Sequence, residues 1–158
     1  ILGTGGAAKA VDFVLRNTFL QPDIKIVSRK PISAGRLDHN HEIKDFNQRL
    51  MAYESLDKDT FQHYSLIVNT TPVGMFPIID DSPPIPYHFL GPQNRLFDLI
   101  YNPQTTLFLE KGKRAGAQTQ NGLEMLCLQA EAAWAIWSQA LGIETGSPEA
   151  FPPDFLNE

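Results

Sequence analysis

The first residues with a chemical signature form a glycine-rich turn near the start of the chain. Gly3 allows a tight turn, Gly5 lets the backbone approach a pyrophosphate, and Ala8 keeps a following helix close to the preceding strand. Free N–H groups at the start of that helix would face the anion. The predicted dinucleotide-binding turn comprises Gly3, Thr4, Gly5, Gly6 and Ala7. A tight strand-to-helix turn that binds nothing is the alternative.

A basic pair follows the second predicted strand. Enzymes that use NAD usually place an acidic residue there to bind the ribose hydroxyls, whereas this chain has Ser28, Arg29 and Lys30. A carboxylate would repel a 2′-phosphate and basic side chains would pair with it, so the sequence favours NADP. The alternative is an exposed basic turn without a ligand.

Another polar segment, Asn69-Thr70-Thr71-Pro72-Val73-Gly74-Met75, follows a short apolar run. Ligands of doubly wound folds bind beyond the carboxyl ends of the strands, where this segment is expected to lie. Its side chains offer hydrogen bonds and Gly74 allows close approach of the backbone. Asn, Thr and Pro also build ordinary turns, so a purely structural loop is the alternative.

Strands and helices that alternate along the chain position these segments. Strands are predicted at the start of the chain and at 24–27, 50–53, 66–69, 96–100 and 117–119, and helices at 57–63 and 106–114. Ala7, Ala10, Val11, Val14, Leu15 and Thr18 predict an amphipathic helix after the glycines, and 31–49 a loop or degenerate helix. The fold class is therefore α/β, Rossmann-like and doubly wound, with a mainly parallel six-stranded sheet and helices on both faces.

A long helix is predicted at the end of the domain, which we place at 1–142, with 143–158 as a surface tail. Its apolar stripe should be core, with Gly142 ending the helix and Gln129, off the stripe, able to face a ligand. The stripe comprises Leu123, Leu126, Cys127, Ala130, Trp134, Trp137 and Leu141.

Composition limits the class of partner. The net charge of -5 and the lack of a long basic run argue against nucleic acid or an anionic membrane. A single cysteine excludes an internal disulfide, and no apolar run approaches the roughly 18 residues of a membrane span, so a cytoplasmic protein fits best. The His and acidic residues at 38–42 suit a solvated loop better than a metal site.

Taken together and in order, these motifs resemble those of shikimate dehydrogenases over residues 1 to about 140. The matching segments are Gly3-Thr4-Gly5-Gly6-Ala7, Ser28-Arg29-Lys30, Asn69 to Met75, Asp98-Leu99-Ile100-Tyr101-Asn102-Pro103, and Asn121-Gly122-Leu123-Glu124-Met125-Leu126 through Gln129-Ala130. Five motifs in one order are far more specific than the glycine turn alone.

The resemblance implies NADP-dependent interconversion of 3-dehydroshikimate and shikimate. It places the catalytic lysine and aspartate in a domain before Ile1, so this chain should carry no catalytic residue and be inactive alone. Tyr101 and Gln129 would reach substrate between the domains, and a homodimer is possible. Cofactor contacts would come from Gly3, Thr4, Gly5, Gly6, Ala7, Ser28, Arg29, Lys30, Asn69, Thr70, Thr71, Pro72, Val73, Met75, Leu99, Gly122 and Met125.

Several alternatives stay open beside this interpretation. The family often has Asn-Arg-Thr in place of Ser28-Arg29-Lys30, and Arg36 could supply the further basic residue. A quinate/shikimate dehydrogenase, a non-catalytic NADP-binding module and an assembly domain are the competing functions. Asp98, near a strand end, is expected to order a loop as a hydrogen-bond acceptor and not to act as a base.

Overall fold

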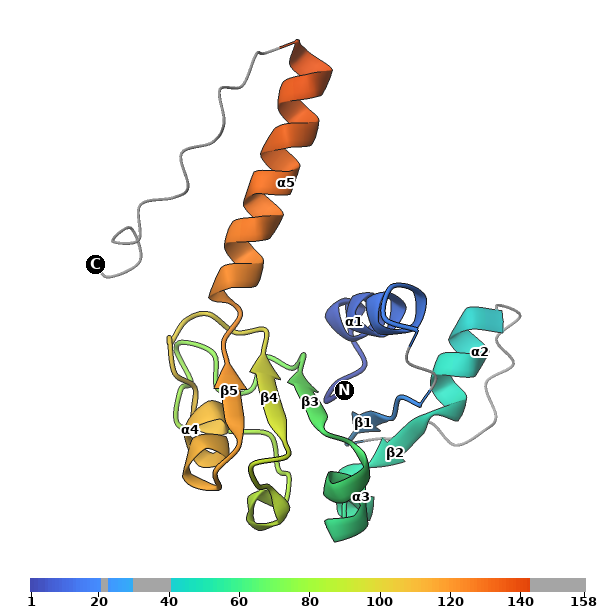
Figure 1. Cartoon of the computed structure of the whole chain (residues 1–158), viewed down its shortest axis with the longest axis vertical. Coiled ribbons are helices and arrows are strands. Elements are labelled where there is room, and N and C mark those ends of the chain that lie inside the picture. Colours follow the sequence, from blue (N-terminus) through green and yellow to red (C-terminus); the bar gives the residue numbers. More distant parts are fainter. Residues whose placement is uncertain (21–22, 30–40, 143–158) are drawn as a thin grey trace.

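This computed structural model describes residues 1–20, 23–29 and 41–142, without the side chains of residues 41–44. Helices and strands alternate along it as expected of an α/β fold (Figure 1). The strands are β1 (Ile26–Ser28), β2 (Leu50–Ala52), β3 (Leu66–Asn69), β4 (Arg95–Asp98) and β5 (Gln118–Gln120). The helices are α1 (Gly6–Asn17), α2 (His41–Gln48), α3 (Lys58–His63), α4 (Leu107–Arg114) and α5 (Leu123–Leu141), with short 3-10 turns η1 (Tyr53–Ser55) and η2 (Tyr87–Phe89).

The strands pair in parallel as two groups, β1 with β2 and β3 with β4 and β5. Leu2 joins the groups through parallel bridges to Val27 and Asn69. The resulting order, β2-β1-Leu2-β3-β4-β5, is that of a dinucleotide-binding fold. The predicted class is confirmed, but the count of six strands is not: within the described residues, five strands form and Leu2 alone holds the place between β1 and β3.

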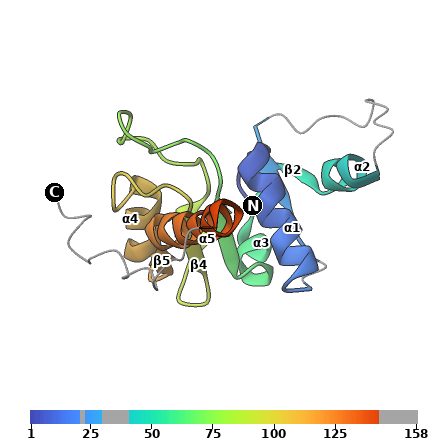
Figure 2. The same ribbon diagram turned by 90° about the horizontal axis from the view of Figure 1, so that it is seen from above.

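The core lies between the sheet and the helices that cover it. Phe108 of α4 and Leu96 of β4 are fully buried there, and α4 packs on β4 and β5. A second buried cluster joins Ala8 of α1 to Ile26 and Phe46. Ala8 is fully buried, so it does allow the close helix-to-sheet packing predicted for it. Helices α4 and α2 lie at opposite ends of the sheet (Figure 2).

Local capping sets the ends of several predicted elements. Asp57 accepts a hydrogen bond from Thr60 N at 2.8 Å and caps α3, and Thr106 caps α4. Gly142 is left-handed (φ 66°) and ends α5, as expected. Part of the segment predicted as loop or degenerate helix is α2, whereas residues 30–40 and the predicted tail at 143–158 lie outside the described residues.

The buried face of α1 differs from the predicted one. Val14 is 43% exposed and Ala7 and Ala10 are exposed, whereas Asp12 is buried. Arg49 explains this rotation, because its two terminal nitrogens bind both Asp12 carboxylate oxygens at 2.6 and 2.8 Å. A paired carboxylate can be buried where a lone one cannot.

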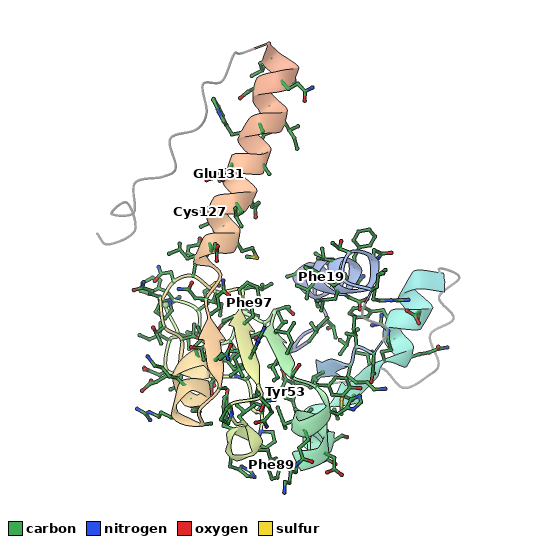
Figure 3. All side chains as sticks on the ribbon, viewed as in Figure 1. Phe19, Tyr53, Phe89, Phe97, Cys127 and Glu131 are labelled. Atoms are coloured by element: carbon green, nitrogen blue, oxygen red, sulfur yellow. The ribbon has the colours of Figure 1, made fainter. Side chains whose placement is uncertain are left out.

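The predicted core stripe of α5 is wrong for this chain. The helix rises away from the sheet, and Cys127 and Glu131 stand well above the side chains packed around the strands (Figures 1 and 3). Trp134, Trp137 and Leu141 are 46%, 61% and 71% exposed. The apolar pattern is present, but no described element lies against it.

Candidate functional site

The glycine turn lies against the loop that follows β3. Gly3 has φ +111°, and a Cβ atom there would come within 2.8 Å of Thr70 Oγ1. Thr70 also holds the residue before the turn, since both its backbone N and its Oγ1 donate hydrogen bonds to Leu2 O, at 3.0 and 2.7 Å. The tight turn predicted for Gly3 is confirmed, and only glycine fits it without strain.

The start of α1 presents open backbone to solvent. Gly5 is the N-cap residue, and no side chain makes a capping hydrogen bond there. Gly6 begins the 12-residue helix. A Cβ atom on Gly5 or Gly6 would meet nothing within 4 Å, and Thr4, Gly5, Gly6 and Ala7 are all exposed. Unpaired N–H groups at a helix start attract anions, so this end can receive a phosphate group.

A groove of about 430 Å³ opens beside this helix end. It brings together residues predicted from separate motifs, because β3 and β4 are neighbours and their carboxyl-end loops meet. Phe76, Ile100 and Asn102 were not predicted as site residues, although Ile100 and Asn102 lie within the matching segment Asp98 to Pro103 and Phe76 follows the segment that ends at Met75. Phe76 N donates to Asn102 O at 3.2 Å. The lining is Ala7, Thr70, Thr71, Pro72, Met75, Phe76, Leu99, Ile100, Tyr101 and Asn102.

The start of α5 is fixed at the back of the same loop. Gly122 N donates to Ile100 O at 3.0 Å, and a Cβ atom on Gly122 would lie 2.1 Å from Leu99 O. Glycine is therefore required for this approach. Met125 is 37% exposed on the first turn of α5 and Gln129 is exposed one turn further on, neither of them lining the groove.

Ser28 and Arg29 lie at the carboxyl end of β1, on the glycine-turn side of the sheet. Gly3 N donates to Val27 O at 2.9 Å, which places Ser28 and Arg29 next to the turn in the fold. Ser28 is half-buried and Arg29 is exposed. Lys30 and Arg36 lie outside the described residues. Arg29 does not line the groove.

A buried polar network underlies the groove. Asn69 Nδ2 donates to Asp98 Oδ1 at 3.0 Å, and Thr106 Oγ1 donates to Asp98 Oδ2 at 2.6 Å. Ile100 N donates to Asp98 Oδ1 at 3.2 Å, so Asp98 orders the loop as predicted. Burial raises the pKa of Asp98, and the hydrogen bonds from Thr106, Ile100 and Asn69 act against that rise.

The remaining predicted side chain of the β3 loop, Thr71, is held by this network. Thr71 N and Oγ1 donate to Asn69 Oδ1 at 3.0 and 2.7 Å, and Val73 N donates to Thr71 Oγ1 at 3.3 Å. Val73 is half-buried behind the groove. Asn69 is fully buried, so it supports the loop without presenting its side chain to the surface.

A larger hollow of about 730 Å³ lies on another side of the sheet, lined mainly by apolar residues of α1, α3 and the strands. Asp23 stands at it, paired with His63 Nε2 at 2.6 Å and accepting from Tyr64 OH at 2.8 Å. These residues precede β1 and β3, at the amino ends of the strands, where doubly wound folds do not bind ligands.

Among the described residues, no three His, Cys, Asp or Glu side chains gather as they would around a metal ion. Most of the 38–42 segment lies outside those residues. Within them, no helix is both long and apolar enough to cross a membrane.

Comparison with known sequences supports the predicted resemblance. No protein-family model matches the chain. Shikimate dehydrogenase (NADP(+)) of Methanococcus maripaludis is 36% identical over 138 residues, which are 87% of this chain and 48% of that enzyme. The corresponding enzyme of Caldanaerobacter subterraneus is 30% identical over the whole chain and 52% of its own length. The chain therefore spans about half the length of the curated relatives it matches.

Solved structures agree on the fold. A chorismate mutase/shikimate 5-dehydrogenase fusion protein from Clostridium acetobutylicum superposes with a TM-score of 0.67 at 34% identity, covering 87% of this chain and 46% of that one. Shikimate 5-dehydrogenase of Thermus thermophilus, in complex with NADP(H) and shikimate, gives 0.65 at 28%, covering 87% and 48%. A 5-ketofructose reductase of Gluconobacter gives 0.65 at 30%, covering 92% and 51%.

The Methanococcus enzyme and the Clostridium and Thermus structures each match 87% of this chain. The resemblance predicted from five motifs is confirmed. In sequence and in fold, the chain is similar to about half the length of the shikimate dehydrogenases (NADP+).

Proposed function

We propose that this chain is the NADP-binding part of a shikimate dehydrogenase-like oxidoreductase, which converts 3-dehydroshikimate and NADPH to shikimate and NADP. One observation carries the proposal. The groove at the carboxyl ends of β3 and β4 unites Ala7 of the glycine turn, Thr71 of the β3 loop and Tyr101 of the β4 loop. Relatives that share these segments are named for NADP(+) and shikimate.

The chain's own residues fit the cofactor. The open start of α1 would hold the pyrophosphate on backbone N–H groups, and Gly5 and Gly6 leave the space in front of it free. Arg29 would pair with the adenosine 2′-phosphate, with Lys30 beside it in sequence. Thr71, Pro72 and Met75 would line the path to the nicotinamide, near Leu99 and Gly122. When bound, NADPH would supply the hydride.

The substrate side is proposed from the opposite rim of the groove. Tyr101 is 49% exposed there, and Gln129 is exposed on α5 one turn beyond Met125. Both would meet shikimate against a domain that supplies the catalytic lysine and aspartate. That domain belongs to the half of the relatives' length that this chain does not match, so these 158 residues would bind cofactor without turnover. We place the enzyme in the cytoplasm and allow a homodimer.

A second candidate is a reductase with the same cofactor half and another substrate. The 5-ketofructose reductase matches as well as the Thermus shikimate enzyme does, at 30% against 28% identity. The similarity therefore does not favour one of these two substrates over the other. Quinate is a further substrate that the half matched here does not distinguish from shikimate.

The test is turnover by the full-length protein, meaning the complete polypeptide in which these 158 residues occur. NADP reduction is expected with shikimate, with weaker or no reduction for quinate, and oxidation of NADPH with 5-ketofructose tests the second candidate. Gln129→Ala should raise the KM for shikimate, whereas the matched variant Gln139→Ala, exposed near the far end of α5, should not. NADPH oxidation with 5-ketofructose and no turnover of shikimate would replace the first candidate by the second.

A further inference from the structure

Asp98 occupies an unusual position for an ionisable group, because it is fully buried and does not line the groove. Its two oxygens accept hydrogen bonds from three elements: Asn69 at the end of β3, Ile100 in the loop after β4, and Thr106 at the start of α4. Such a group is retained only where its partners satisfy it.

One of these contacts determines how the β3 loop is arranged. A carboxylate only accepts hydrogen bonds, so Asp98 fixes the Nδ2 side of the Asn69 amide toward itself. The amide oxygen of Asn69 must then face the other way, where it accepts from both N and Oγ1 of Thr71 at 3.0 and 2.7 Å. The orientation of Thr71 therefore follows from the position of Asp98.

The same oxygen of Asp98 arranges the other wall of the groove. Oδ1 accepts from Ile100 N at 3.2 Å, between Leu99 and Tyr101. Ile100 O in turn accepts from Gly122 N, which fixes the start of α5. Two loops and a helix end thus take their positions from one atom that lies beneath the groove.

We propose that Asp98 is a positioning residue, which holds the cofactor-side loop at Thr71 and the substrate-side loop at Tyr101 in a fixed position relative to each other. It does so as a hydrogen-bond acceptor and not through its charge. The inference rests on the proposed function. It goes beyond the loop-ordering role, because it couples the binding of NADPH to the placement of substrate. A displacement of about 1 Å in such loops can cost on the order of a hundredfold in rate.

The two oxygens of Asp98 allow this role to be separated from stability. In Asp98→Asn, the carbonyl oxygen can stay on Asn69 and Ile100, while the new NH₂ group faces Thr106 Oγ1, which can accept. In Asp98→Ala both loops lose their acceptor. Thr106→Val is the matched control, since it removes the cap of α4 and the hydrogen bond to Oδ2 but leaves Oδ1 and its partners in place.

The experiment measures NADPH binding to the full-length protein by cofactor fluorescence, with the thermal midpoint and the turnover kinetics of each variant. Asp98→Ala should weaken NADPH binding and lower kcat/KM by about tenfold or more. Asp98→Asn should stay within about threefold of wild type, the cost of one neutral hydrogen bond. Thr106→Val should lower the thermal midpoint without changing the KM of either ligand.

Thr71→Val keeps the test decisive if Asp98→Ala does not fold, because it changes the half-buried end of the network and leaves Asp98 with all its partners. It should weaken NADPH binding with an unchanged thermal midpoint. An Asp98→Asn variant as impaired as Asp98→Ala, or a Thr71→Val variant that binds NADPH normally, would overturn the inference alone. A wild-type protein that binds no NADPH would overturn the proposed function together with it.

Discussion

The network beneath the groove and the long helix α5 are opposites in chemistry and in burial. Asn69, Asp98 and Thr106 are polar and fully buried, and each has hydrogen-bond partners inside the chain. Helix α5 carries an apolar stripe, yet Trp137 is 61% exposed and the helix stands away from the sheet (Figure 1). Polarity therefore does not decide burial here; the presence of a partner within the chain does.

The two regions differ in where their packing and hydrogen-bond partners come from. The network has all its partners within three neighbouring elements, so the groove above it is complete in this chain. An exposed apolar surface of this extent usually marks a contact with another polypeptide. The groove is thus supported from within the chain, whereas no described element covers α5.

The largest expected effect comes from truncating an aromatic side chain in each region. Phe108→Ala removes a fully buried ring and should destabilise the chain by about 3–5 kcal/mol. Trp137→Ala should change its stability by less than about 0.5 kcal/mol, because that ring is largely exposed. Urea unfolding of both variants measures the contrast. Equal losses would show that α5 packs on the sheet after all.

The two glycines that flank α5 give the next contrast. Gly122→Ala places a Cβ atom 2.1 Å from Leu99 O and should cost about 3 kcal/mol, since backbone must move. Gly142→Ala meets no neighbouring atom and should cost only about 1 kcal/mol, for the left-handed conformation. Thermal unfolding compares them. A larger loss at Gly142 would contradict the close approach at the groove.

The smallest expected effect concerns Asp23, an exposed acidic side chain outside both regions. Hydrogen bonds from His63 and then Tyr64 lower the pKa of Asp23 below its usual 3.8. A lowered pKa in the folded state stabilises the fold above pH 3.8, and that contribution is lost as pH falls through the folded pKa. Asp23→Asn should cost less than about 1 kcal/mol at pH 5, because the pair is exposed.

Urea unfolding of wild type and Asp23→Asn between pH 5 and pH 3 checks the sign. The difference in unfolding free energy between the two proteins should shrink as pH falls. A difference that grows toward pH 3 would show that the ionised form of Asp23 is not the one stabilised in the fold.

Much of the fold could be predicted because local signals determine it. Gly3 makes the tight turn and Gly142 ends α5 where their patterns predict, and the short helix predicted at 57–63 is α3 (Lys58–His63). The buried face of α1 could not be predicted in this way. It depends on the pairing of Asp12 with Arg49, 37 residues away, which no periodicity reveals.

The site shows the same division. Thr71 and Tyr101 follow strand ends, so parallel pairing of β3 with β4 brings them together as the motifs predict. Phe76 and Asn102 join the groove through a backbone hydrogen bond between two loops, and nothing in their residue types indicates it. The exposure of Trp134 could not be predicted in this way. An apolar stripe indicates that one face of a helix packs against another surface, but not that this surface belongs to the same chain.

The most direct test of the central claim is calorimetric titration of the full-length protein with NADP and with NAD. NADP should bind more tightly, and Arg29→Ala should weaken NADP binding by roughly 10- to 100-fold while leaving NAD unchanged, because a charged hydrogen bond to phosphate is lost. The matched variant Arg95→Ala, exposed at the opposite end of the sheet, should bind both as wild type does. Binding of neither cofactor, or equal binding that Arg29→Ala does not change, would contradict the account.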